Sequence, residues 1–180
     1  MTITEQIEYD VKCLDTYFRQ LFSMAQEASL QEPSSVTTSD EPEYFVAQNL
    51  IRPDMVCNVY SLVDFRLAKL CRFHRCKGHL ALSYKDIKGE NDLAVYHKYL
   101  TKVAALTLQA VQPSYDHLEN LRKVRNCLIH SGGHIPPEQR IEIEKIPGIT
   151  MNASLVMIAD SFVWDSLNHA KAYLCAVAQA

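Results

Sequence analysis

The residues of this sequence best suited to chemistry lie in one short stretch, in which Arg125, Asn126 and His130 occur within six positions. An arginine can clamp a phosphate through paired N–H donors, and a histidine can move a proton near neutral pH. The amide of Asn126 can orient either group. Gly132 and Gly133 follow and are predicted to end the helix that carries the three residues. These residue types favour cleavage of a phosphodiester without a metal ion.

The helix that must position these side chains is predicted from Tyr115 to Ser131, with Ser114 as its N-terminal cap. Its apolar face is formed by residues at spacings of three and four: Leu118, Leu121, Val124 and Leu128. Each helical residue turns by about 100°, so roughly 140° separates Arg125 from His130. The two side chains therefore do not face one point within a single straight helix.

Two arrangements would resolve this divergence. The helix could unwind near the glycines and let His130 swing, or two copies of the helix could meet so that each Arg125 serves the histidine of the other chain. A third interpretation is that the pair only stabilises the end of the helix, which is the more common role of such a pair taken alone.

Further side chains near the motif suit an anionic ligand. Asn126 and His130 share one face with Arg122, and Lys123 adds a second local cation. His134 follows the glycines closely enough to reach the same cleft. We therefore predict Arg122, Lys123 and His134 as substrate-binding residues beside the catalytic set.

No metal or cofactor is predicted. The residues Cys71, His74, Cys76 and His79 lie within nine positions, but their segment continues a helix on which Cys71 and Cys76 diverge. A zinc site normally draws its ligand pairs from separated turns, so packing is the favoured interpretation. The sequence contains no glycine-rich phosphate loop and no assembled Ser-His-Asp set.

Length and composition indicate one globular domain spanning 1–180. The hydrophobic fraction is 48% and the charged fraction 22%, with a formal net charge of −3, so any contact with nucleic acid must be local. No secretory signal or membrane-length apolar run is present. The six cysteines are scattered through helical patterns, which favours reduced thiols and a cytoplasmic location.

The remaining pattern predicts an all-α, up-and-down helical bundle with a small β-hairpin before the C-terminal helix. Helices are expected over 3–29, 44–76 with a break near Pro53, 92–110, and from about 160 to the end, with a short turn at 83–87. The outer side of the second helix is expected to be basic: Arg66, Lys69, Arg72, Arg75 and Lys77. A mobile loop is predicted at 31–43. Strict alternation over 140–146 predicts a strand that pairs with 150–158, giving a hairpin insertion at 138–158.

This order of elements resembles the HEPN superfamily of all-helical domains. The resemblance rests on the helix with Tyr60 to Cys71, the Lys85–Gly89 step, the Tyr99-Leu100 helix and the Arg125-Asn126-(three residues)-His130 motif, and it extends from about Tyr44 to the end. Many HEPN domains are ribonucleases of toxin–antitoxin or antiviral systems. The resemblance implies a homodimer whose composite cleft holds both motifs, and metal-independent cleavage of RNA.

In that interpretation His130 acts as general base or acid, Arg125 stabilises the phosphorane and Asn126 orients them. The need for a 2′-hydroxyl predicts RNA as the partner, and a toxin–antitoxin role would add a protein antitoxin as a second partner. The alternative is a non-catalytic, HEPN-like dimeric module that binds a nucleotide, an RNA or a protein.

Overall fold

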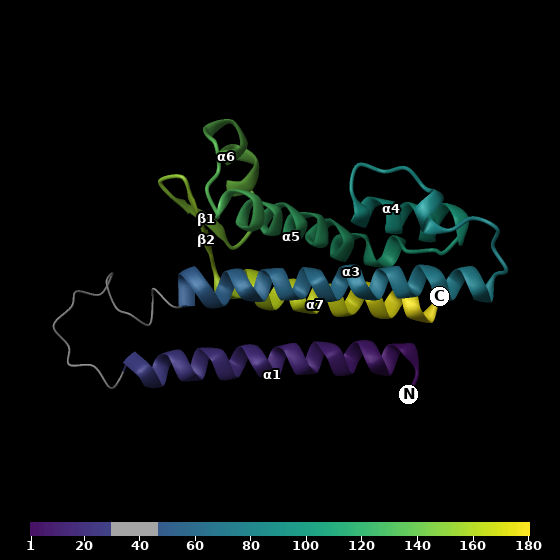
Figure 1. Cartoon of the computed structure of the whole chain (residues 1–180), viewed down its shortest axis with the longest axis horizontal. Helices are drawn as coiled ribbons and strands as arrows, with labels where there is room; N and C mark the ends of the chain where they lie inside the picture. The colour runs from purple at the N-terminus through teal and green to yellow at the C-terminus, as the bar shows by residue number, and fades with distance from the viewer. Residues whose placement is uncertain (30–46) are drawn as a thin grey trace.

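The computed structural model describes residues 1–29 and 47–180. Its long helices are α1 (Ile3–Ser29), α3 (Arg52–Lys77), α5 (Gln112–Ser131) and α7 (Asp160–Gln179). Successive long helices run in opposite directions, and both termini lie at the same end of the molecule (Figure 1). Helix α7 packs against α1, α3 and α5. The predicted up-and-down helical bundle is therefore confirmed, whereas the loop predicted at 31–43 lies outside the described residues.

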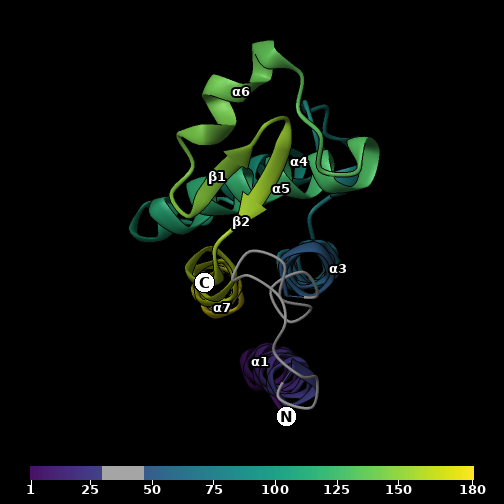
Figure 2. The same cartoon turned by 90° about the vertical axis from the view of Figure 1, so that its left-hand side faces the viewer.

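Helix α1 covers one side of the α3–α7 pair, and α5 covers the other (Figure 2). The apolar spacing of α1 predicted its inner face, on which Ile7 and Phe18 are fully buried. Arg66 on α3 is also buried, because its Nε donates to Asp10 of α1 at 2.6 Å. The prediction that Arg66 belongs to the exposed basic side of α3 is therefore wrong, since a partner 56 residues away holds it inside.

Near Pro53, where a break is predicted, the backbone stays helical but its hydrogen-bond pattern changes. A π-helical turn, Ala47–Ile51, leads into α3, and Pro53 lies in the first turn of that helix. A proline is tolerated there because the first N–H groups of a helix have no intrahelical acceptor. Pro113 is tolerated in the first turn of α5 for the same reason, and α5 begins at Gln112. Ser114 is consequently buried within the helix and is not its N-terminal cap.

The helix predicted over 92–110 is shorter than expected. Helix α4 spans Asp92–Lys98 and continues as a π-helical turn, Tyr99–Val103. The chain then leaves the helix at Ala105, whose φ of 55° is left-handed, and makes a 3-10 turn at Gln109–Val111. The short turn predicted at 83–87 is present as a 3-10 helix, Tyr84–Asp86, closed by a capping box from Ser83.

A small module follows α5 and contains the hairpin. Strands β1 (Ile149–Asn152) and β2 (Leu155–Ile158) pair antiparallel, with Ile149 opposite Ile158. The strand predicted over 140–146 is wrong, because this segment belongs to α6 (Pro137–Glu144). Figure 2 shows α6 and the hairpin together beside α5, on the side away from α1. The insertion at 138–158 is thus a helix followed by a hairpin.

The misassigned segment shows how alternation can mislead. Of the alternating isoleucines, Ile143 is buried but Ile141 is 68% exposed, so the pattern does not mark a buried face. Pro137 in the first turn and a 2.8 Å ion pair between Arg140 and Glu144, four residues apart, both favour a helix.

None of the described helices is long and apolar enough to cross a membrane.

Candidate functional site

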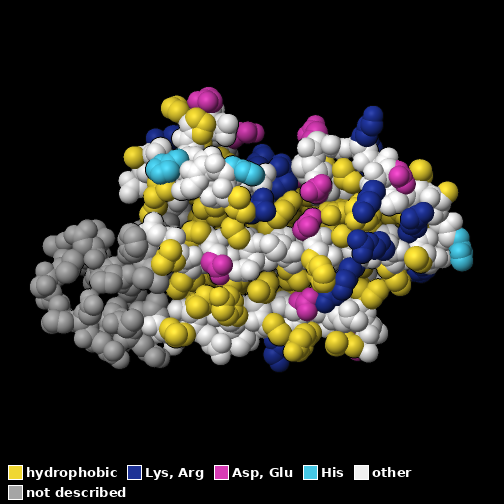
Figure 3. Space-filling view, viewed as in Figure 1, with side chains coloured by type: hydrophobic (Ala, Val, Ile, Leu, Met, Phe, Trp, Pro, Cys, Tyr) yellow, Lys and Arg dark blue, Asp and Glu magenta, His cyan; other side chains and the backbone are white. Residues whose placement is uncertain are grey.

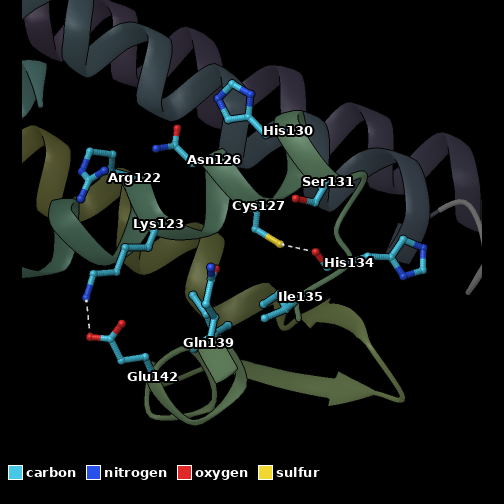
Figure 4. Close-up of a pocket in the computed structure, with 11 residues that line it drawn as sticks. Arg122, Lys123, Asn126, Cys127, His130, Ser131, His134, Ile135, Gln139 and Glu142 are labelled. Atoms are coloured by element: carbon cyan, nitrogen blue, oxygen red, sulfur yellow. Dashed lines mark hydrogen bonds and ion pairs between the residues drawn. The ribbon is translucent and has the colours of Figure 1, made fainter. Parts of the chain in front are cut away.

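Helix α5 carries the predicted site residues along one row. Arg122, Asn126 and His130 recur at intervals of four, so their side chains lie above one another on one face of the helix (Figure 4). Leu118, Leu121 and Val124 on the opposite face are fully buried against the bundle. The apolar face thus fixes the rotation of α5 and directs the polar row toward the surface.

The end of α5 is set by the glycines. Gly132 adopts a left-handed conformation with φ of 58°, and its N–H bonds to the carbonyl of Cys127, as predicted for a C-terminal cap. Gly133 joins the end of α5 to the hairpin, because its carbonyl accepts a hydrogen bond from the backbone N–H of Val156 at 2.9 Å. His130 therefore lies in the last turn of a helix whose end is held by β2.

A cavity of about 330 Å³ opens between α5 and the α6–hairpin module. Arg122, Asn126 and His130 line its α5 side, and Gln139 and Glu142 line its α6 side (Figure 4). We call this space the His130 cavity.

The charges of the His130 cavity favour an anion. Lys123 lies 3.6 Å from Glu142, which neutralises it in part. Arg122 is paired with Glu119, whose other carboxylate oxygen accepts from Tyr115 at 3.1 Å. Glu119 itself lies outside the residues that line the cavity, so the lining keeps two cations against the single carboxylate of Glu142.

Arg125 lies in a second cavity of similar volume, about 330 Å³, formed between α5 and α3. Its lining includes Tyr60 and Asp64 of α3 and Asp92 of α4. We call this space the Arg125 cavity. Arg122 and Asn126 line both cavities, so the two spaces adjoin along α5.

The guanidinium of Arg125 is oriented on two sides. Its Nη1 donates to Oδ1 of Asn126 at 3.1 Å, and its Cζ lies 5.6 Å from the centre of the Tyr60 ring. Its Nε is buried without a hydrogen-bond partner among the described residues. Asn126 therefore has the orienting contact to Arg125 that the sequence interpretation assigned to it.

The structure keeps Arg125 and His130 apart within one chain. They line different cavities, as the helical spacing predicted, and α5 stays helical to Ser131, so no unwinding brings them together. His130 is exposed, and its neighbour Ile129 is 50% exposed. The unwinding of the helix is therefore not observed, whereas the meeting of two chains and the role at the helix end both stay predictions.

His134 lies at the rim of the His130 cavity but points elsewhere. Its Nδ1 contacts the hydroxyl of Ser154 at 2.9 Å, and Figure 4 shows the ring directed away from Asn126 and Lys123. Its carbonyl accepts from the thiol of Cys127 at 3.6 Å. Burial raises the pKa of Cys127, so this thiol stays protonated and is a poor nucleophile.

Tyr60 is the site residue that sequence reasoning missed. Burial and the nearby Asp64 raise the pKa of Tyr60 to about 12, so its hydroxyl stays protonated and can donate a hydrogen bond. Asp64 itself accepts from Tyr96 at 3.0 Å. Because Tyr60 lies on another helix, 65 positions before Arg125, no local pattern could have placed it at the site.

Cys71, His74 and His97 contribute to packing. His74 is buried and contacts the carbonyl of Val177 at 2.8 Å, and Cys71 is buried beside it on α3. No group of three or more metal-ligating side chains occurs in the described part of the chain. His97 is half-buried, stacked on Tyr115 and bonded to the hydroxyl of Tyr173 at 2.7 Å.

Comparisons with known protein families, with curated proteins and with solved structures returned no match.

Proposed function

We propose that this protein is a metal-independent endoribonuclease of the HEPN type, active as a homodimer. The observation that carries the proposal is the row of Arg122, Asn126 and His130 on the wall of an open cavity, with Arg125 oriented by Asn126 next to it. A guanidinium, an amide and an imidazole are the groups that hold a phosphate and transfer protons beside it.

The reaction follows from these groups. His130 removes the proton of a ribose 2′-hydroxyl, whose oxygen attacks the adjacent phosphorus. Arg125 stabilises the charge that develops on the phosphorane oxygens. The P–O5′ bond then breaks, and the 5′-oxygen takes a proton from the protonated His130, which is thereby returned to its neutral form. The products are a 2′,3′-cyclic phosphate and a free 5′-hydroxyl.

A dimer can bring an Arg125 and a His130 to the same site, which a single chain does not do. Because Arg125 and His130 line separate cavities, one chain presents the two groups apart. The exposed Ile129 beside His130 gives this end of α5 an apolar contact for a second copy. The biological setting that fits such an enzyme is a toxin–antitoxin or phage-defence system, with a cytoplasmic location and a protein antitoxin as its restraint.

The test compares cleavage of a labelled single-stranded RNA by the wild type, Arg125→Ala and His130→Ala in the presence of EDTA. We expect each variant to lose roughly 10²–10⁴-fold in rate, the usual contribution of a positioned acid–base group or charge stabiliser. Arg19→Ala, at an exposed arginine of α1, and His79→Asn, at an exposed histidine beyond α3, are the matched controls. Equal cleavage by all five proteins, or none by the wild type, contradicts the proposal.

The second candidate is a non-catalytic dimeric module for a nucleotide, an RNA or a protein. Glu119 already pairs with Arg122, and Asp64 and Asp92 lie close to Arg125, so both arginines have carboxylates near them. A His130→Ala protein that binds RNA as well as the wild type, when neither protein cleaves it, would favour this module.

A further inference from the structure

The C-terminal half of α3 carries an exposed row of alternating aromatic and basic side chains. Phe65, Lys69, Phe73 and Lys77 recur at intervals of four, so they form one ridge along the helix surface. The Phe65 ring is 52% exposed and the Phe73 ring 37% exposed. We call these four residues the aromatic–lysine ridge.

Each lysine of the ridge lies over the preceding ring. The Nζ of Lys69 is 4.2 Å from the centre of the Phe65 ring, and that of Lys77 is 5.9 Å from the Phe73 ring. A lysine stem is flexible, so its ammonium can move to a phosphate and leave the ring face to a base. Exposed rings and cations in this order are the elements of a surface that holds single-stranded nucleic acid.

The charged residues around the ridge are basic. From residue 65 to residue 85 the chain contains no Asp or Glu, although the whole protein is acidic with a net charge of −3. Figure 3 shows Lys and Arg side chains gathered over the C-terminal half of α3. Lys69, Arg72 and Lys77 are exposed and belong to no ion pair within the described residues. These three cations are therefore free to contact a ligand.

A cavity beside the ridge extends the basic surface. It has a volume of about 310 Å³, and Arg72, Arg75 and Lys85 contribute to its lining. The guanidinium of Arg75 donates to the carbonyls of Leu80 and Ala81, which fixes the loop that forms its wall. Arg72 and Lys85 remain as the cations that can reach a ligand phosphate.

The ridge also leads toward the candidate site. Its row begins one turn earlier at Ser61, and Ser61 lines the Arg125 cavity. The ridge from Phe65 to Lys77 is about 18 Å long at the rise of an α-helix. At about 3.4 Å per stacked nucleotide this length accommodates roughly five nucleotides.

We infer that the aromatic–lysine ridge, with Arg72 and Lys85, is a docking surface for single-stranded RNA that leads the strand to the Arg125 cavity. Bases stack on Phe65 and Phe73, while the four cations contact phosphates. The choice of RNA rests on the proposed function, but the surface is argued from its own rings and charges.

The test measures binding of fluorescent, unstructured RNA of 12 nucleotides to full-length protein carrying His130→Ala, which keeps the RNA intact. Replacing both rings (Phe65→Ala with Phe73→Ala) is expected to weaken binding at least about 10-fold. If four phosphates are contacted, a plot of log K against the logarithm of the salt concentration is expected to have a slope of about −2.8. The double variant Lys69→Glu with Lys77→Glu removes two of these contacts, so its slope is expected to be about −1.4. An RNA of four nucleotides is expected to bind more weakly than one of 12.

Matched controls lie outside the ridge. Tyr9→Ala with Tyr17→Ala removes two exposed rings of α1, and Lys12→Glu with Lys102→Glu makes the same change in charge at two exposed lysines. Circular-dichroism melting verifies that every variant folds. The inference is overturned if folded ridge variants bind like these controls. It is also overturned if duplex RNA binds as tightly as single strands, or if the ring variants only dissociate a dimer.

The two proposals fail separately. If the wild type cleaves RNA and the ridge variants bind and cleave like it, the ridge proposal is wrong and the endoribonuclease stands. If RNA binding depends on the ridge but the wild type never cleaves, the ridge stands and the endoribonuclease is wrong.

Discussion

Two histidines away from the site form a polar cluster between α5 and α7. The Nε2 of His117 lies 2.9 Å from the hydroxyl of Ser166, and that hydroxyl donates to the carbonyl of Phe162 at 2.6 Å. The hydroxyl oxygen must therefore accept from His117, so Nε2 carries the proton. The His117 ring stacks on His169, with centroids 4.4 Å apart. A second proton on His117 would be buried beside another imidazole.

This cluster predicts a loss of stability in acid. Burial, with a smaller contribution from His169, lowers the pKa of His117 to about 4. Between pH 6.5 and about 4 the unfolded chain binds a proton at His117 that the folded chain does not. The free energy of unfolding therefore falls as the pH falls through this window, by about 3 kcal/mol.

Urea titrations at pH 7 and pH 4.5 measure this loss. The variant His117→Gln should lose less stability than the wild type over that interval, and His79→Asn, at an exposed position, should match the wild type. The same pH dependence in His117→Gln as in the wild type would show that His117 is not responsible.

At the scale of elements, sequence periodicity predicted what depends on a single helix. The bounds of α1 and the last helix follow from apolar spacing, and the Arg122–Asn126–His130 row follows from the helical repeat. The predictions that were wrong concern residues whose positions depend on partners far away in the sequence. The alternation at 140–146 could not reveal that β2 pairs with 149–152, and Arg66 could not be placed without Asp10 on another helix. Tyr60 joins the site for the same reason.

The junction between the hairpin module and α7 depends on a glycine. Gly148 has φ of 79°, and a Cβ added there would lie 2.9 Å from the Cβ of Phe162, a fully buried residue in the first turn of α7. Gly132 is also left-handed, but an added Cβ would meet nothing within 4 Å. An alanine at either position would strain the backbone, but only an alanine at position 148 would also clash with a neighbouring side chain.

Thermal unfolding of Gly148→Ala and Gly132→Ala separates these effects. Gly132→Ala is expected to lose about 1–2 kcal/mol from the left-handed backbone alone. Gly148→Ala adds overpacking against Phe162, so its total loss is expected to be about 3 kcal/mol or more. If both variants lose the same free energy of unfolding, α7 can shift to accommodate the added methyl group, and the predicted clash with Phe162 is wrong.

At the scale of the whole molecule, the bundle presents two separate groups on one surface helix. The core fixes α5 so that Arg125 lines the cavity beside α3, whereas His130 is exposed at the edge of the other cavity. A homodimer with two-fold symmetry would pair the Arg125 of each chain with the His130 of the other. We therefore propose that catalysis occurs between chains.

Mixing two inactive variants tests that claim most directly. Arg125→Ala and His130→Ala proteins are unfolded together, refolded at equal concentration and assayed for RNA cleavage. Half of the dimers are then mixed, and each mixed dimer holds one site with both groups intact, so about one quarter of the wild-type rate is expected. If the mixture is as inactive as either variant alone, while wild-type protein treated in the same way regains its rate, the shared site is contradicted.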